Sequence, residues 1–407
     1  MSLERLLALR RAIVPNNAFY ASRCPEFSSL EEFSARVPFT SKQDLIADQQ
    51  AHPPFGTNLT YPLEHYTRFC QTSSTTGNPL RWLDTPESWA WMAGCWRRVF
   101  EHAGVKRGDH VFFAFSFGPF LGFWTAFDAA ASMGCLAIPG GGMSSTARLR
   151  TLHDSRAQVL CCTPTYAIRL AEVAQEEGVD LATLSVQKII VAGEPGGSVP
   201  GTRALLERYW PGARIFDHHG MTETGPVSYE CPKRAGVLHI MEAEYFAEIV
   251  DPATGAPVAN GQGELVLTNF GRDASPVIRY RTGDLVQARR GVCECGTDEL
   301  ALEGGILARS DDMIVIRGVN VYPSAIEDAI RACGGVAEYR VEVATVRSMI
   351  ELRLQVEASP DASEATQLAH RIEAGLRDAL GMRIPVTIVP AGTLPRFEMK
   401  ARRWVRI

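Results

Sequence analysis

A hydroxyl-rich loop is the first part of the sequence whose residue types can do chemistry. Five hydroxyl residues precede a glycine there, in the order Thr72, Ser73, Ser74, Thr75, Thr76 and Gly77. Hydroxyl groups donate hydrogen bonds to phosphate oxygens, and glycine lets backbone N–H groups approach an anion closely. The loop is therefore a candidate triphosphate site, with an ordinary Ser/Thr-rich turn as the alternative. No G-x-x-x-x-G-K-[ST] element and no G-x-G-x-x-G after a strand is present, which argues against a P-loop ATPase and a Rossmann dehydrogenase.

A second group of residues has the types that bind a metal. Cys231 and His239 lie in one segment, and Cys293 and Cys295 lie in another. Three thiolates and an imidazole are a ligand set typical of structural tetrahedral zinc, and four protein ligands leave no open position for catalysis. The spacing differs from C-x₂-C, so only the fold can join the two pairs. The alternative is three buried thiols and a surface histidine.

Composition and charge exclude several classes of protein. The charged fraction is 21% and the hydrophobic fraction 46%, as in ordinary globular proteins, and no run is long enough to span a bilayer. A net charge of -5 and a pI near 6.0 give no basic field for a nucleic acid. The N-terminal stretch lacks a secretory signal and predicts a short surface helix. The ten cysteines are irregularly spread, unlike a disulfide framework. These features predict a cytoplasmic protein without membrane or nucleic-acid partners.

The positioning elements follow from hydrophobic periodicity. In the first two thirds of the chain, strands at 110–115, 135–139, 158–162 and 188–192 alternate with helices at 122–133, 146–154 and 165–177. This alternation predicts parallel α/β layers. From Leu238 the pattern changes to shorter strands such as 245–250 and 264–268, which indicates a β-rich part. After Arg309, strands at 313–316, 339–344, 350–356 and 386–389 and helices from about 324 and up to 380 predict a small α+β domain.

The order of several short motifs carries a family resemblance. After the hydroxyl-rich loop come Gly193-Glu194-Pro195, the segment from Asp217 to Glu223, Tyr280-Arg281-Thr282-Gly283-Asp284, Arg309-Ser310-Asp311-Asp312, the segment from Arg317 to Pro323, and the segment from Leu394 to Lys400. Together they resemble the superfamily of acyl-CoA synthetases, peptide-synthetase adenylation domains and luciferases, and most closely its phenylacetate-CoA ligase branch. The resemblance implies a large adenylation domain at 1–308, β-rich from about 238, and a small mobile C-terminal domain at 309–407.

For the nucleotide site, the resemblance implies one role for each matching residue. The loop from Thr72 to Gly77 would hold the β- and γ-phosphates of ATP. The adenine would lie against Gly193, Glu194 and Pro195, and the nucleotide along Asp217, His218, His219, Gly220 and Met221, with His219 stacking on the base. Thr222 would contact the α-phosphate and Glu223 would bind Mg²⁺. Asp284 would accept hydrogen bonds from the ribose, and Arg309 would support the ribose and phosphate end. The two histidines could instead be structural, and the side chain of His218 should point opposite to that of His219.

Residues near the end of the chain complete the implied mechanism. Lys400 matches the late catalytic lysine of the family, whose ammonium offsets the repulsion between a carboxylate and the α-phosphate. Asp311 matches the hinge between the domains. Rotation about this hinge would withdraw Lys400 and bring the loop of Arg317, Gly318 and Asn320 to the site for thioester formation. Three loop positions depart from the branch: Thr72 replaces Ser, Ser74 replaces Gly and Asn78 replaces Lys. We expect these departures to weaken ATP binding.

The acyl group needs its own pocket, and an aromatic-rich stretch at 112–124 borders it in the family. Phe117, Phe120, Gly141 and Met221 are the candidate wall residues for a flat aryl acid, although aromatic residues of such a stretch also form cores. The predicted function is ATP-dependent conversion of a carboxylic acid, expected to be aromatic, to an acyl-AMP and then to a coenzyme A thioester. Carrier-protein phosphopantetheine or an amine as acceptor, a non-catalytic binding homologue and a homodimer remain open.

Overall fold

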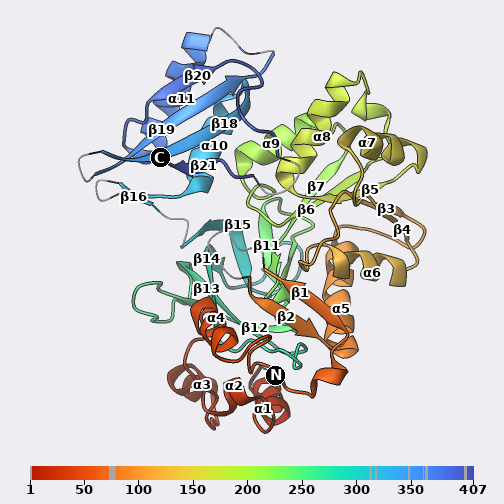
Figure 1. Cartoon of the computed structure of the whole chain (residues 1–407), viewed down its shortest axis with the longest axis vertical. Coiled ribbons are helices and arrows are strands. Elements are labelled where there is room, and N and C mark those ends of the chain that lie inside the picture. The colour runs from red at the N-terminus through yellow and green to blue at the C-terminus, as the bar shows by residue number, and fades with distance from the viewer. Residues whose placement is uncertain are drawn as a thin grey trace.

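Figure 1 shows the computed structural model of the chain, which describes residues 2–72, 79–310, 314–316, 319–346, 349–360, 362, 365–397 and 401–407. The predicted order of layers is confirmed: a parallel α/β part, a β-rich part and a C-terminal α+β part follow one another. No helix in these ranges is long and apolar enough to cross a membrane.

A five-stranded parallel sheet lies at the centre of the α/β part, in the order β4-β3-β5-β6-β7. Its strands are β3 (His110–Phe113), β4 (Leu136–Pro139), β5 (Val159–Cys162), β6 (Lys188–Ala192) and β7 (Arg214–His218). Successive side chains of β5 face opposite helical layers: Val159 and Cys161 pack toward α5 and α6, whereas Leu160 and Cys162 pack toward α7, α8 and α9. These helices are α5 (Pro86–His102), α6 (Trp124–Ser132), α7 (Ser145–Asp154), α8 (Pro164–Glu176) and α9 (Pro200–Tyr209), with a 3₁₀ turn η2 (Leu181–Thr183).

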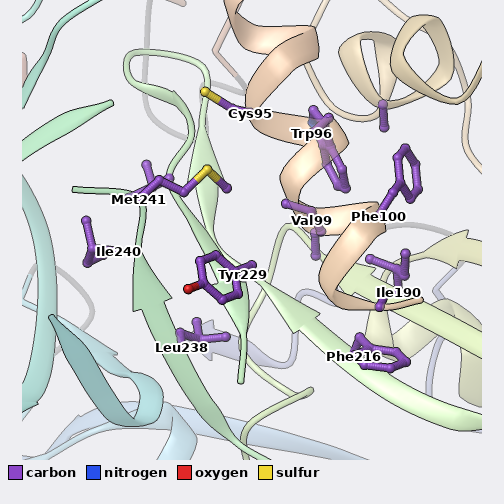
Figure 2. Packing of buried hydrophobic residues seen from close by; sticks show 14 of the residues in the cluster. Cys95, Trp96, Val99, Phe100, Ile190, Phe216, Tyr229, Leu238, Ile240 and Met241 are labelled. Atoms are coloured by element: carbon purple, nitrogen blue, oxygen red, sulfur yellow. The ribbon is translucent and has the colours of Figure 1, made fainter. Parts of the chain in front are cut away.

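A six-stranded antiparallel sheet forms the β-rich part, in the order β10-β11-β15-β14-β13-β12. Its strands are β10 (Ser228–Glu230), β11 (Val237–Ile240), β12 (Tyr245–Val250), β13 (Gly261–Asn269), β14 (Tyr280–Arg289) and β15 (Ala301–Arg309), and a short pair β8 (Gly220–Met221) and β9 (Gly225–Pro226) precedes it. Side chains of α5 share one core with both sheets, and Figure 2 shows Trp96 and Phe100 of this helix in the same cluster as Phe216 and Leu238. The common core fixes β7 relative to β14, and the candidate site lies where these strands meet.

The N-terminal helices form a separate cluster against the start of β14. They are α1 (Ser2–Ile13), α2 (Ala18–Ala21), α3 (Leu30–Arg36) and α4 (Lys42–Ala51), followed by η1 (Leu63–His65) and the hairpin β1 (Arg68–Gln71) and β2 (Arg81–Asp84). The prediction that the first helix is a surface element was wrong, because Leu6, Leu9 and Ile13 are buried. Their i, i+3, i+7 spacing provides one apolar face, and that face packs on the same core as Tyr280.

The C-terminal part has its own core. Its sheet has the order β20-β19-β18-β21, with α10 (Pro323–Cys333) and α11 (Ala365–Leu380) packed against it. The strands are β16 (Ile314–Ile316), β17 (Val319–Val321), β18 (Val336–Val346), β19 (Met349–Ala358), β20 (Val386–Val389) and β21 (Trp404–Arg406). The last strand was not predicted. It pairs in parallel with β18 near Val341, so the end of the chain is fixed within this sheet.

Candidate active site

A buried histidine, aspartate and arginine meet where β7 and β14 approach each other. Nε2 of His219 lies 2.9 Å from Oδ2 of Asp284, and Nη1 of Arg309 lies 3.2 Å from Oδ1 of the same carboxylate. Asp284 is on β14 and Arg309 ends β15, and the two residues are direct partners in the sheet register. Nδ1 of His219 is buried and finds no hydrogen-bond partner among the described residues. The structure therefore brings together three residues predicted from separate motifs and leaves a polar atom in need of a partner.

The neighbouring His218 faces the other way, as expected for consecutive residues at a strand end. Its ring lies against Trp96 of α5 with centroids 4.2 Å apart, and its Nδ1 lies 2.7 Å from the carbonyl oxygen of Ser228. Burial, with a smaller contribution from the charge of His219, lowers the pKa of His218 to about 3. His218 is thus a neutral core residue, which corresponds to the structural alternative rather than to a side chain directed at a nucleotide.

Glu194 and Asp217 are buried carboxylates on either side of the last two parallel strands. Glu194 follows β6 and accepts from the N–H of Thr165 at 2.9 Å and from the N–H of Ala401 at 3.0 Å. Asp217 accepts from the hydroxyl of Ser198 at 2.6 Å. Burial raises the pKa of both carboxyl groups. Gly193 has a φ of 95°, a conformation that favours glycine, so the chain turns sharply into Glu194 and Pro195.

Thr222 and Glu223 lie in the turn between β8 and β9, and a buried arginine supports this turn. Arg272 donates to the carbonyl oxygens of Thr222 and Glu223 at 2.5 and 3.2 Å. The same guanidinium binds Asp84 of β2 through two contacts of 2.7 Å, and both side chains are fully buried. The Glu223 carboxylate is also buried and hydrogen-bonds Tyr280. An accessible oxygen ligand on a rigid turn fits Mg²⁺, a hard cation that retains several waters.

Lysine 42 also reaches this carboxylate, and the sequence patterns above did not identify it. Nζ of Lys42 lies 3.6 Å from Oε1 of Glu223. The residue is 181 positions earlier in the chain, at the first position of α4. The only sequence signal nearby is the Ser41–Asp44 capping box, which marks a helix start and not a site. Arg272 and Asp84 were missed for the same reason, because no motif contains them.

Several predicted residues lie outside the described ranges. They are Ser73, Ser74, Thr75, Thr76 and Gly77 of the hydroxyl-rich loop, the hinge residue Asp311, Arg317 and Gly318 of the thioester loop, and Lys400. Asn320 is in β17. Thr72 is described: its hydroxyl accepts from the N–H of Leu80 at 3.0 Å, and its own N–H donates to the Leu80 carbonyl at 2.9 Å. These two bonds close the base of the loop between β1 and β2.

A cavity of about 400 Å³ opens beside the edge of the parallel sheet, near the ends of β3 and β4. Its lining consists of Ser116, Phe117, Trp124, Phe127, Pro139, Gly141 and Gly142. Phe117 and Gly141 were predicted wall residues, whereas Phe120 and Met221 are not in this lining. A Cβ at Gly141 would lie 3.1 Å from Cδ2 of Phe117, so glycine keeps the space open. Phe120 instead packs edge-on against Phe115, and Met221 packs beside the N-terminal cluster.

The four metal-type ligands converge as the zinc hypothesis requires. The ligand atoms of Cys231, His239, Cys293 and Cys295 all lie within 4.8 Å of one another. Sγ of Cys231 is 3.7 Å from Sγ of Cys293, and Sγ of Cys295 is 3.5 Å from Nε2 of His239. Nδ1 of His239 lies 3.3 Å from the carbonyl oxygen of Glu299, a partner that would fix the ring tautomer. Number, type and spacing of the donors fit a closed tetrahedral zinc site.

Comparison with known proteins decides the family. A family model described as AMP-binding enzyme matches residues 33–271, and a model described as AMP-binding enzyme C-terminal domain matches residues 318–406. The chain belongs to the AMP-binding enzyme family. A phenylacetate-coenzyme A ligase from Thermus thermophilus is 32% identical over 97% of this chain and 92% of its own length. One from Escherichia coli is 31% identical over 93% of this chain and 85% of its own length. The predicted resemblance and enzyme class are confirmed.

Solved structures of the family locate this chain among its conformations. 2-Hydroxyisobutyryl-CoA ligase in the postadenylation state with 2-HIB-AMP has a TM-score of 0.92, 31% identity, and coverage of 100% of this chain and 88% of that one. The same ligase with 2-HIB-AMP and CoA in the thioester-forming state has a TM-score of 0.74, 32% identity, and coverage of 99% and 88%. The domains of this AMP-binding enzyme are therefore arranged as in the postadenylation state.

Proposed function

We propose that the chain is an aryl-acid:CoA ligase. It joins an aromatic carboxylic acid to the AMP part of ATP, releases pyrophosphate, and then transfers the acyl group to the thiol of coenzyme A. The observation that carries the proposal is the contact of His219, Asp284 and Arg309 beside Glu223. This cluster lies on a fold whose relatives have been solved with acyl-AMP and with CoA.

The residues divide the first half-reaction among them. Asp284 is a buried carboxylate that can accept from ribose hydroxyls, and His219 presents a flat ring beside it for the base. Thr222 binds the α-phosphate, and Glu223 holds Mg²⁺, which when bound supplies positive charge to the phosphate oxygens. Lys400 offsets the repulsion between the attacking carboxylate and the α-phosphate. In support of this role, the next residue, Ala401, already donates to Glu194.

The cavity beside β4 supports an aromatic and uncharged acyl group. Phe117, Trp124 and Phe127 offer flat apolar walls, Gly141 and Gly142 leave room between them, and no charged side chain lines the space. Its volume of about 400 Å³ is within the usual range for small-molecule pockets. A charged acid side chain would lose hydration there without a partner, which opposes binding. We therefore assign aryl acids without a second charge as the substrate class.

The Cys/His cluster is proposed to hold a structural Zn²⁺. Four protein ligands leave no open coordination position, so the cluster takes no part in the reaction. Its role is to join β10, β11 and the turn before β15, which lie in the sheet that also contains Asp284.

The decisive experiment is ATP/pyrophosphate exchange with a panel of aromatic and aliphatic acids, followed by thioester formation with and without CoA. We expect exchange with aryl acids and a CoA-dependent thioester. Lys400→Ala should lower exchange by about 10²–10³-fold, because it removes a charge used in the transition state. The exposed Lys106→Ala is the matched control and should exchange normally. Absence of exchange with every acid would disprove the ligase, and undiminished exchange in Lys400→Ala would disprove the role of that lysine.

A further inference from the structure

Lys42 is a cation at the edge of the nucleotide site that no motif assigns. Its ammonium lies 3.6 Å from the carboxylate of Glu223 and its side chain is 43% exposed, whereas the Glu223 side chain is only 6% exposed. A partly exposed ion pair at this distance contributes little to stability. The ammonium can therefore move to a ligand at a small energetic cost.

The backbone that carries Lys42 is tied directly to the site. The N–H of Thr40 donates to the carbonyl of Arg279 at 3.0 Å, and the N–H of Arg281 donates to the carbonyl of Thr40 at 2.9 Å. These bonds form a parallel bridge between Thr40 and Tyr280, four residues before Asp284. The next residue, Ser41, begins α4 with a capping box. The position of the lysine is therefore fixed by sheet and helix bonds.

The choice of residue is unusual for that position. Lys42 is the first residue of α4, where the helix dipole presents positive charge. A cation there is unfavourable and an acidic residue is preferred. A residue that contradicts the local preference without an evident structural gain indicates a functional requirement.

The same helix runs along the hairpin that carries the hydroxyl-rich loop. Two turns after Lys42, the amide of Gln49 makes two bonds to the backbone of Arg81, of 2.6 and 3.0 Å. Arg81 begins β2, one residue after Leu80 closes the base of the loop on Thr72. The loop itself, residues 73–78, has no lysine or arginine in its sequence. A triphosphate held by its hydroxyls would thus need a cation from another segment.

On the basis of the nucleotide site proposed above, we propose that Lys42 binds the β- and γ-phosphates of ATP and holds the departing pyrophosphate. When a carboxylate oxygen of the acid forms a bond to the α-phosphorus, the bond from that phosphorus to the bridging oxygen breaks. The electron pair leaves with pyrophosphate, and acyl-AMP remains. Lys42 stays protonated throughout, and its charge stabilises the leaving group without any transfer of a proton.

The test separates phosphate binding from general damage to the site. Affinities for Mg-ATP, Mg-pyrophosphate and AMP are measured by calorimetry for the wild type, Lys42→Met, Lys42→Arg and the exposed control Lys106→Met. Loss of one charge-assisted contact should weaken ATP and pyrophosphate binding by about 10- to 100-fold in Lys42→Met. AMP binding should stay within about twofold, since AMP lacks both outer phosphates. Lys42→Arg should recover most of the loss, and Lys106→Met should match the wild type.

Two results would overturn the proposal. Unchanged affinity of Lys42→Met for ATP and pyrophosphate would show that the lysine does not contact the outer phosphates. An equal loss of AMP affinity would show that it acts only by supporting Glu223 and the site as a whole. Failure of the wild type to bind both ATP and AMP would instead reject the proposed nucleotide site, so the two failures are distinguishable.

Discussion

Two adjacent histidines show how the backbone separates a candidate binding residue from a core residue. His219 contacts Asp284 at 2.9 Å, whereas His218 lies between Trp96 and the Ser228 carbonyl. Their sequence types are identical, and only the alternation of side chains at the end of β7 distinguishes them. Burial keeps His218 neutral by lowering its pKa from 6.5 to about 3. This difference in pKa makes the stability of the fold depend on pH.

The pH dependence has a definite sign. Between about pH 6.5 and 3 the unfolded chain takes up a proton at His218 that the folded chain does not, so stability is complete above pH 6.5 and falls as the pH falls. At pH 5 this amounts to about 2 kcal/mol. In His218→Asn, the amide nitrogen can still donate to Ser228 but does not titrate. Denaturant unfolding at pH 7.5 and pH 5 should show a loss of stability smaller by about 2 kcal/mol in the variant. An equal loss in both proteins would contradict the assignment.

At the same scale, the sequence identified residues that stand inside motifs and missed those that do not. His219, Asp284 and Arg309 were found because each belongs to a short ordered pattern. Lys42 and Arg272 have no such pattern. They reach Glu223 and its turn through contacts between segments 49 and more residues apart, which depend on the packing of the whole domain.

The antiparallel sheet is the element that turns scattered thiols into a cluster. Cys231 follows β10, His239 is on β11, and Cys293 and Cys295 lie in the turn between β14 and β15. β11 pairs with both β10 and β15, so the register alone brings the segments together. The sequence predicted the ligand types but could not predict this register. Local strand positions were more accessible: 188–192, 245–250 and 386–389 agree with β6, β12 and β20, because polar or turn residues bound each apolar run.

Metal content and thermal stability test the cluster together. The purified protein should contain one zinc per chain, and Cys295→Ser should lose it. Loss of a ligand to a structural metal should cost about 3 kcal/mol or more, which lowers the Tm by about 5–10 °C for a unit of this size. The control is Cys333→Ser, a partly exposed thiol on α10 outside the cluster. Zinc-free protein with an unchanged Tm would reject the structural zinc.

At the scale of the whole molecule, the C-terminal part packs on α8 and α9 of the large domain. The carboxylate of Asp328 on α10 accepts from the N–H of Gly201 at 2.8 Å, and Arg396 lies 3.6 Å from Glu172 of α8. Helix α9 has no side-chain cap from its own N-cap residue, Val199. Asp328 therefore caps α9 from the other part of the chain. The sequence indicated the small domain from its element order, but this contact has no local signal.

Because this cap exists only while the two parts are docked, it should favour the arrangement that resembles the postadenylation state. Asp328→Ala removes the cap, which is worth about 0.5–2 kcal/mol, and should shift the population of that arrangement by about 2- to 30-fold. We expect slower ATP/pyrophosphate exchange, whereas thioester formation from purified acyl-AMP and CoA should keep its rate or increase. Asp328→Asn retains the accepting oxygen and should restore most of the exchange. If both half-reactions slowed equally in Asp328→Ala, the contact would serve the fold and not the choice between arrangements, because an interaction present in only one state must affect the two steps unequally.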